Sequence, residues 1–192
     1  MKVLPFRRVQ LIDLRTLEIE SVSDIVFDVT EPGRFRNLRF YTEAPYTRER
    51  QLQQFKMFVA DPRRFVFLIV CVENREPVGS IGLHEYDEHG LNARLSAIIF
   101  ADRFDGQGYF REAFGQLLRL AFKPRELGGI GLHKVYVNLF KENRTARAFY
   151  EKQGFHLDGT LREHYENGGW HDMVQYSLLE REWLGCRVRR PE

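Results

Sequence analysis

The chain has 192 residues, of which 43% are hydrophobic and 29% are charged, values close to those of average globular proteins. A chain of this length buries about 70% of its unfolded surface, so we expect a full hydrophobic core and exclude intrinsic disorder. Its 29 Lys and Arg residues against 27 Asp and Glu give a net charge of +2, too small for a protein whose affinity comes from neutralising nucleic-acid phosphates. The two cysteines, Cys71 and Cys186, lie too far apart in the sequence to indicate a disulfide scaffold or a cysteine metal cluster.

The N-terminal residues lack the apolar segment of a signal peptide, and no stretch approaches the length of a membrane span. We therefore expect a cytoplasmic protein that has neither a membrane nor a nucleic acid as its partner. No repeat or linker divides the sequence, which predicts one domain over residues 1–192. A homodimer is left open.

The first quarter of the chain has weak patterns. Residues 9–14 favour a short strand, and Thr47 precedes helically spaced apolar residues that predict a capped helix over 48–60. Between them lie an acidic stretch over 18–31 and an arginine-rich stretch containing Arg34, Arg36 and Arg39. Both stretches are most simply interpreted as charged surfaces that face solvent. The alternative is that they form an entrance for a charged substrate.

From residue 65 the pattern is clearer. Residues 65–72 form a continuous apolar run, typical of a strand buried on both faces, and the turn at 74–77 predicts a hairpin with 78–86. A third strand is expected over 93–100. It is followed by a loop containing Gly106 and Gly108 and then by a helix that ends before Pro124.

The C-terminal third continues with a strand over 134–139 and a helix that Asn143 caps and Gly154 ends. Residues 155–179 predict two more strands, joined by a turn at 167–169. The order of elements is neither a pure βαβ alternation nor all-β, so we expect an α/β fold of the α+β type.

The glycine loop is the first candidate for a binding site. A strand that leads through a glycine turn into a helix directs backbone N–H groups at one point, which is an anion site, although a simple tight turn explains the glycines equally well. A dinucleotide-binding loop would need a third glycine where Arg111 stands, and the Walker sequence is absent. Neither nucleotide motif fits.

A second motif changes this interpretation. Residues 143–155, Asn-Arg-Thr-Ala-Arg-Ala-Phe-Tyr-Glu-Lys-Gln-Gly-Phe, together with Gly-Gln-Gly-Tyr at 106–109, resemble the GNAT superfamily of N-acetyltransferases. Residues 158–162 and 167–172 resemble the branch of ribosomal-protein N-terminal acetyltransferases and spermidine acetyltransferases. The resemblance implies a mixed, mostly antiparallel sheet flanked by helices, with central strands that splay apart to form an acyl-CoA cleft.

The activity that the resemblance implies is transfer of an acetyl group from acetyl-CoA to a primary amine. The acceptor is left open among a protein N-terminus, a polyamine, an amino sugar and an aminoglycoside. Direct attack through a tetrahedral intermediate is expected, since no nucleophile elbow or metal-ligand spacing is present. Asp105 and Phe110 depart from the family motif and would weaken or reorient the grip on the cofactor, so a non-catalytic acyl-CoA-binding or interaction module is the alternative.

The expected cofactor contacts lie on both motifs and on the strands beside them. They are Phe100, whose surrounding backbone would supply the oxyanion donor, Gly106, Gln107, Gly108, Tyr109, Phe110, Arg111, Asn138, Asn143 and Arg147. For Asn143, a plain helix cap is an equal and compatible alternative. The resemblance makes Arg144 and Arg147 candidates for contacts with the 3′-phosphate, although exposed helix arginines are the simpler interpretation.

Three residues are expected to act in catalysis. Tyr150 matches the family tyrosine that assists the departing thiolate, and a packed core tyrosine is its alternative role. The base is expected at Glu85 first and His84 second, because strand alternation sends them to opposite faces and only one can line the cleft. No metal is expected.

Overall fold

The computed structural model describes residues 7–31, 34, 47–166 and 169–189, which contain one seven-stranded sheet in the order β1-β2-β3-β4-β5-β7-β6. The strands are β1 (Val9–Asp13), β2 (Phe65–Cys71), β3 (Pro77–Asp87), β4 (Asn92–Ile99), β5 (Lys134–Phe140), β6 (His156–Glu166) and β7 (Trp170–Leu179). The helices are α1 (Ile19–Val29), α2 (Arg48–Ala60), α3 (Tyr109–Phe122), α4 (Arg144–Lys152) and α5 (Glu180–Arg189).

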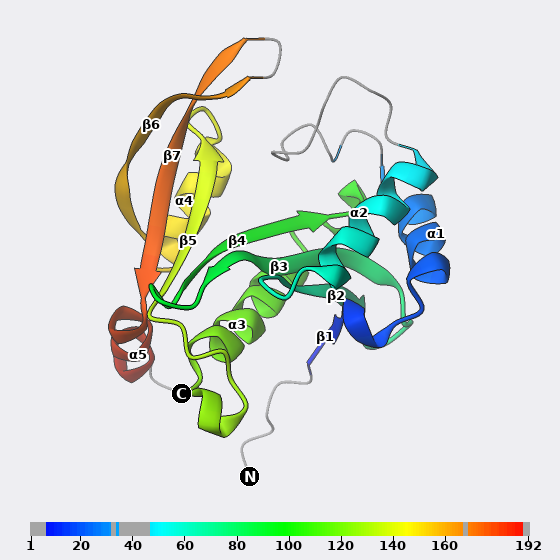
Figure 1. Cartoon of the computed structure of the whole chain (residues 1–192), viewed down its shortest axis with the longest axis horizontal. Helices are drawn as coiled ribbons and strands as arrows, with labels where there is room; N and C mark the ends of the chain where they lie inside the picture. Colours follow the sequence, from blue (N-terminus) through cyan, green and yellow to red (C-terminus); the bar gives the residue numbers. More distant parts are fainter. Residues whose placement is uncertain (1–6, 32–33, 35–46, 167–168, 190–192) are drawn as a thin grey trace.

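The centre of the sheet is open. Neighbouring strands pair antiparallel except β4 and β5, which are parallel and pair only from Asn92↔Lys134 to Arg94↔Tyr136. Beyond these residues the two strands diverge, so that β5, β6 and β7 rise away from β4 (Figure 1). The predicted mixed, splayed sheet is confirmed.

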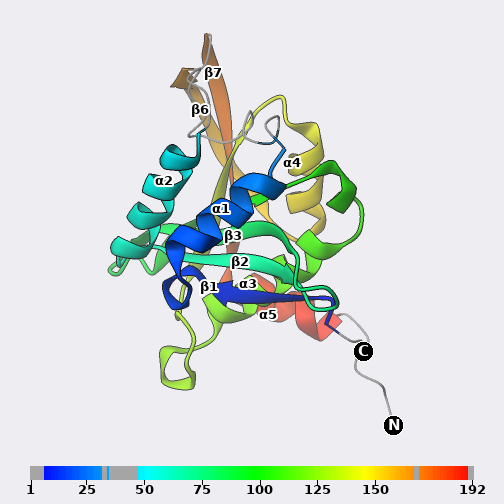
Figure 2. The same cartoon turned by 90° about the vertical axis from the view of Figure 1, so that its right-hand side faces the viewer.

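Helices cover the two faces of the β1–β4 half of the sheet. Helices α1 and α2 lie on one face and α3 lies on the other, while α5 contacts β7 (Figure 2). Alternate residues of β2 pack into different apolar clusters: Ile69 packs with the side chains of α3, and Leu68 packs with those of α1 and α2. The strand over 65–72 is therefore buried on both faces, as its apolar run predicts.

Both predicted helix caps are present. The hydroxyl of Thr47 accepts from the N–H of Arg50 at 3.3 Å, and Oδ1 of Asn143 accepts from the N–H of Ala146 at 3.0 Å. The caps fix the first turns of α2 and α4. The turn at 167–168 and the arginines Arg36 and Arg39 lie outside the described residues.

Sequence reasoning missed helices α1 and α5. In α1, apolar residues such as Val26 pack on the inner side of the helix, while acidic residues fill the outer face. Two of these, Asp24 and Asp28, form ion pairs with Arg48 of α2. The acidic stretch thus forms mainly the outer face of α1, and ion pairs connect this helix to α2.

No helix in the described segments is both long enough and apolar enough to cross a membrane.

Candidate active site

A cavity of about 750 Å³ lies where β4 and β5 separate. Side chains from both faces of the sheet line it: α1 and α2 contribute on one side, and α3 and α4 on the other. It therefore passes between the splayed strands, as a cleft that admits two reactants from opposite sides must do. His84, Ser96, Phe110, Asn143 and Tyr150 are all in its lining.

The glycine loop ends at this cavity. Gly106 and Gly108 have φ angles of 69° and 80°, in the left-handed region that favours glycine, and α3 begins at the next residue, Tyr109. The N–H groups of the first turn have no acceptor within the helix, which is the arrangement that the predicted anion site requires. Asp105 and Phe110, on either side of the loop, line the cavity.

The predicted side-chain contacts around this loop are less direct. Gln107 and Arg111 are exposed, and the amide of Gln107 donates to the carbonyl of Arg103 at 3.0 Å. The ring of Tyr109 lies under the Arg8 guanidinium, at 5.4 Å from its centre, and packs against Phe104. The loop therefore offers its backbone as the anion site.

Phe110 departs from the family motif without filling this site. Its ring centre lies 4.9 Å from that of Phe149 on α4 and 5.9 Å from that of Phe114 on α3. The ring packs between the two helices and forms part of the cavity wall.

Among the backbone N–H groups predicted around Phe100 as oxyanion donors, that of Phe100 itself is not available. The N–H of Phe100 donates to the carbonyl of Val78 on β3 at 3.1 Å, so it is already used. Ladder hydrogen bonds alternate along an antiparallel strand, so the N–H groups of Ile99 and Ala97 point to the opposite edge of β4. That edge faces the opening, and both residues line the cavity.

Tyr150 is buried among aromatic rings and also reaches the cavity. It is 6% exposed and packs against Phe114, Phe149 and Phe155, with centroid distances of 5.9, 5.3 and 5.2 Å. Burial raises the pKa of the Tyr150 hydroxyl above its ordinary value, so this group stays protonated and available as a donor. Tyr150 is thus both a packed core residue and part of the cavity lining.

Asn138 and Asn143 complete this side of the cavity. Asn143 both caps α4 and lines the cavity, so its two expected roles are compatible in geometry. The side-chain oxygen of Asn138, on β5, is buried and has no hydrogen-bond partner among the described residues. A buried acceptor without a partner in a cavity is suited to a polar ligand.

The structure reverses the expected placement of His84 and Glu85. His84 is 2% exposed and lines the cavity, with its Nε2 atom 2.7 Å from the hydroxyl of Ser96 on β4. Glu85 is not among the lining residues, and its carboxylate binds the guanidinium of Arg94 at 3.1 Å and the hydroxyl of Tyr136 at 3.2 Å. The β3–β4 register shifts after His84, and Glu85 has a φ angle of 56°. Alternation alone could not predict this irregularity.

The environment of His84 keeps its imidazole neutral. Burial is the main cause that lowers the pKa of His84 to about 3, and the positive charges of Arg94 and Arg64 contribute less. A neutral imidazole bonded to a serine can hold that hydroxyl in place. Ser96 was not predicted, and its position opposite Gly82 on β3 becomes evident only from the strand register.

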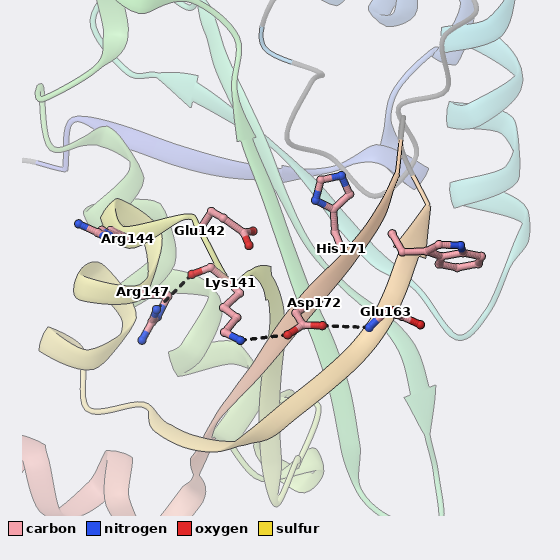
Figure 3. Close-up of a pocket in the computed structure, with 8 residues that line it drawn as sticks. Lys141, Glu142, Arg144, Arg147, Glu163, His171 and Asp172 are labelled. Atoms are coloured by element: carbon pink, nitrogen blue, oxygen red, sulfur yellow. Dashed lines mark hydrogen bonds and ion pairs between the residues drawn. The ribbon is translucent and has the colours of Figure 1, made fainter.

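Arg147 lies on a different surface. Its guanidinium donates to the Tyr176 hydroxyl at 3.2 Å and to the Lys141 carbonyl at 3.1 Å, in a second hollow of about 720 Å³ between α4 and the β6–β7 hairpin (Figure 3). Lys141 in turn binds Asp172, whose other oxygen accepts from the Glu163 N–H. These groups are paired with one another, and Arg147 is not in the lining of the cavity with Tyr150.

The described residues contain no group of three or more His, Cys, Asp or Glu side chains placed to hold a metal ion. The polar groups that line the cavity near His84 include hydroxyl, amide, guanidinium and imidazole groups.

Comparison with known proteins identifies the family of this fold. Residues 11–156 match the family described as Acetyltransferase (GNAT) domain. The chain belongs to this family. It is 37% identical over 108 residues to a Bacillus subtilis protein named as the ribosomal N-acetyltransferase YdaF, and the match covers 56% of each chain. The matched segment thus spans little more than half the length of that relative.

Other relatives of this GNAT protein are named for a different acceptor. The spermidine N(1)-acetyltransferase of Vibrio cholerae is 28% identical over 151 residues, which cover 77% of this chain and 82% of the relative. A solved structure of a Vibrio cholerae spermidine N-acetyltransferase, SpeG, aligns with a TM-score of 0.73 at 23% identity, over 94% of this chain and 98% of SpeG. A T. thermophilus protein described as an acetyltransferase aligns with a TM-score of 0.77 at 24% identity, over 98% and 97% of the two chains. At these identities the structural matches support the fold.

Proposed function

We propose that this protein transfers the acetyl group of acetyl-CoA to a primary amine by direct attack of the amine on the thioester. The observation that carries the proposal is the shared cavity: Phe110 on the first turn of α3 and Tyr150 on α4 line it from one side of the sheet, and the Ser96–His84 pair, beside Phe58 of α2, lines it from the other. A thioester placed between them would face an amine across the opening.

Each chemical step has a group in reach. The amine nitrogen forms a bond to the thioester carbon, and the carbonyl electrons move to its oxygen, which the N–H groups of Ile99 and Ala97 stabilise. Collapse of this tetrahedral intermediate breaks the carbon–sulfur bond. The Tyr150 hydroxyl donates a hydrogen bond to the departing thiolate, which takes up a proton to leave as free CoA.

The proton of the attacking nitrogen leaves through the Ser96–His84 pair or through water. With its pKa lowered to about 3, His84 is too weak a base to deprotonate an ammonium ion, so the amine must arrive neutral. After attack the nitrogen is positively charged and more acidic, and its proton passes to solvent water through the Ser96 hydroxyl, which His84 holds in place. Glu85, held by Arg94, is not assigned to this step.

The carboxylates of Glu31, Asp102 and Asp105 also line the cavity but are paired with Arg34, so the choice of acceptor is argued from polar atoms that have no partner. Gln51 and Asn138 each present a buried side-chain oxygen, and Arg94 a buried Nε–H, none with a hydrogen-bond partner among the described residues. All three residues line the cavity. A protonated polyamine supplies only donors and would leave the Arg94 Nε–H unpaired. An amine next to a carbonyl or carboxylate, as at a peptide N-terminus, supplies both a donor and an acceptor.

Release of free CoA from acetyl-CoA tests this proposal. We expect release with a glycyl peptide amide and a much lower kcat/KM with spermidine. The value of kcat/KM should rise with pH as the amine becomes neutral, near pKa 8 for an α-amine and about 10.4 for a lysine-like amine. Preference for spermidine would contradict the proposed acceptor, and no release with any amine would contradict the proposed activity.

A further inference from the structure

Asp105 stands where a diphosphate should be repelled. It directly precedes Gly106, lines the cavity beside the anion-binding turn of α3, and carries a half-exposed carboxylate. Two charges of the same sign a few ångströms apart repel each other, and more strongly near a protein surface than in bulk water. Something must offset this charge if acetyl-CoA binds here.

Arg34 supplies the opposite charge. Its guanidinium binds Asp105 through two hydrogen bonds, of 3.2 Å to Oδ1 and 2.8 Å to Oδ2, which is the strongest geometry for this pair. The same guanidinium pairs with Asp102 and lies 3.7 Å from the carboxylate of Glu31. The Arg34 side chain is 19% exposed, whereas those of Asp102 and Asp105 are 84% and 56% exposed, so these ion pairs lie partly in solvent.

Glu31 fixes the same segment to the sheet. Its backbone N–H donates to the carbonyl of Phe100 at 2.8 Å, and its carboxylate accepts from the N–H of Asp102 at 3.0 Å. The chain that follows α1 is thus attached to the connection between β4 and the glycine loop. We call Glu31, Arg34, Asp102 and Asp105 the loop clasp.

We infer that Arg34 is a positioning residue for the cofactor: it offsets the charge of Asp105 and holds the glycine loop with its N–H groups directed at the diphosphate. This inference rests on the proposed use of acetyl-CoA. In this inference Asp105 binds Arg34. The charge that Asp105 introduces into the family motif is therefore offset by Arg34, which lies 71 positions earlier in the chain.

The inference makes a rescue experiment possible. Arg34→Gln leaves three carboxylates of the clasp without their cation, and we expect the Kd for CoA measured by calorimetry to rise about five- to tenfold at low salt. High salt should reduce this difference because it screens exposed charges. Arg34→Gln combined with Asp105→Asn removes both the cation and the nearest carboxylate, and should restore the Kd to within about twofold of wild type.

Two controls separate charge from general damage. Arg48 forms comparable ion pairs with Asp24 and Asp28 between α1 and α2, outside the cavity lining, so Arg48→Gln should leave the Kd for CoA unchanged. Pantetheine lacks the diphosphate. Its own Kd, obtained from competition with CoA, should therefore be the same in wild type and in Arg34→Gln.

Several results would overturn the inference. If Arg34→Gln binds CoA as tightly as wild type, the clasp has no role in cofactor binding. If the double variant binds as weakly as Arg34→Gln, Arg34 acts by contacting the phosphates or by supporting the fold, and does not act by offsetting Asp105. If the wild-type protein does not bind CoA at all, the proposed function fails together with this inference, whereas the first two results leave the proposed function intact.

Discussion

Acidification should destabilise this protein through His84 more than through any exposed histidine. His84 is 2% exposed, bonded to Ser96, and faces Arg94 across the β3–β4 pair. Burial first, and the charges of Arg94 and Arg64 second, lower its pKa to about 3. In the unfolded chain the imidazole returns to about 6.5.

The sign and size follow from these two values. Between them the unfolded chain binds a proton that the folded protein does not, so the stability that neutral His84 contributes is complete above about pH 6.5 and is lost as the pH falls toward 3. A pH of about 5 lies roughly one and a half pH units below the unfolded pKa of about 6.5. Over this interval the free energy of unfolding falls by about 2 kcal/mol.

Urea unfolding at about pH 8 and about pH 5 measures this loss. The wild-type free energy of unfolding should fall by about 2 kcal/mol more than that of His84→Gln, which has no titrating group at this position. His156→Gln, at an exposed position on β6, is the matched control and should fall as wild type does. If wild type and His84→Gln lose equal stability, His84 is not held neutral by the fold and the assignment of its environment is wrong.

Three further substitutions test the cavity. Tyr150→Phe keeps the aromatic packing and removes the hydroxyl, so kcat should fall by roughly 10² to 10⁴ with little change in the Kd for acetyl-CoA; an unchanged kcat would leave Tyr150 as a core residue only. Gly108→Val forces a branched side chain onto a φ angle of 80°, with its Cβ 2.8 Å from the Arg8 guanidinium, and should abolish the thermal shift caused by acetyl-CoA, whereas Gly159→Ala, in open space on β6, should keep it. Glu85→Gln should leave kcat/KM and its pH profile unchanged because the carboxylate lies outside the cavity lining; a loss of roughly 10² would restore Glu85 as the base.

Sequence patterns predicted those parts of the fold that local physics determines. The caps at Thr47 and Asn143 and the glycine loop before α3 depend on neighbouring residues only, and the structure confirms them. The apolar run over 65–72 likewise needed no knowledge of the partner strands. Helix α1 was missed although Ile19, Val22, Val26 and Val29 pack on its inner side, because the acidic residues between them find their cations on the distant helix α2.

The site depends more on contacts distant in sequence. Whether His84 or Glu85 enters the cavity depends on which face of β3 meets helix α2, where the His84 ring contacts Phe58, and the alternating sequence of β3 does not reveal it. Among the N–H groups predicted around Phe100, that of Phe100 itself is excluded by its bond to Val78, which is also a property of strand pairing. The link between Arg34 and Asp105 joins residues 71 positions apart. The roles of Tyr150 and the cofactor residues stay predictions.

Transfer of an isotopically labelled acetyl group from acetyl-CoA to a glycyl peptide amide tests the central proposal most directly. The proposal predicts labelled amide and free CoA in equal amounts, with no label retained on the protein when the amine is omitted. A protein whose melting temperature rises with acetyl-CoA but which forms no labelled amide with any amine would be a binding module with a GNAT fold, and the account of catalysis would be wrong.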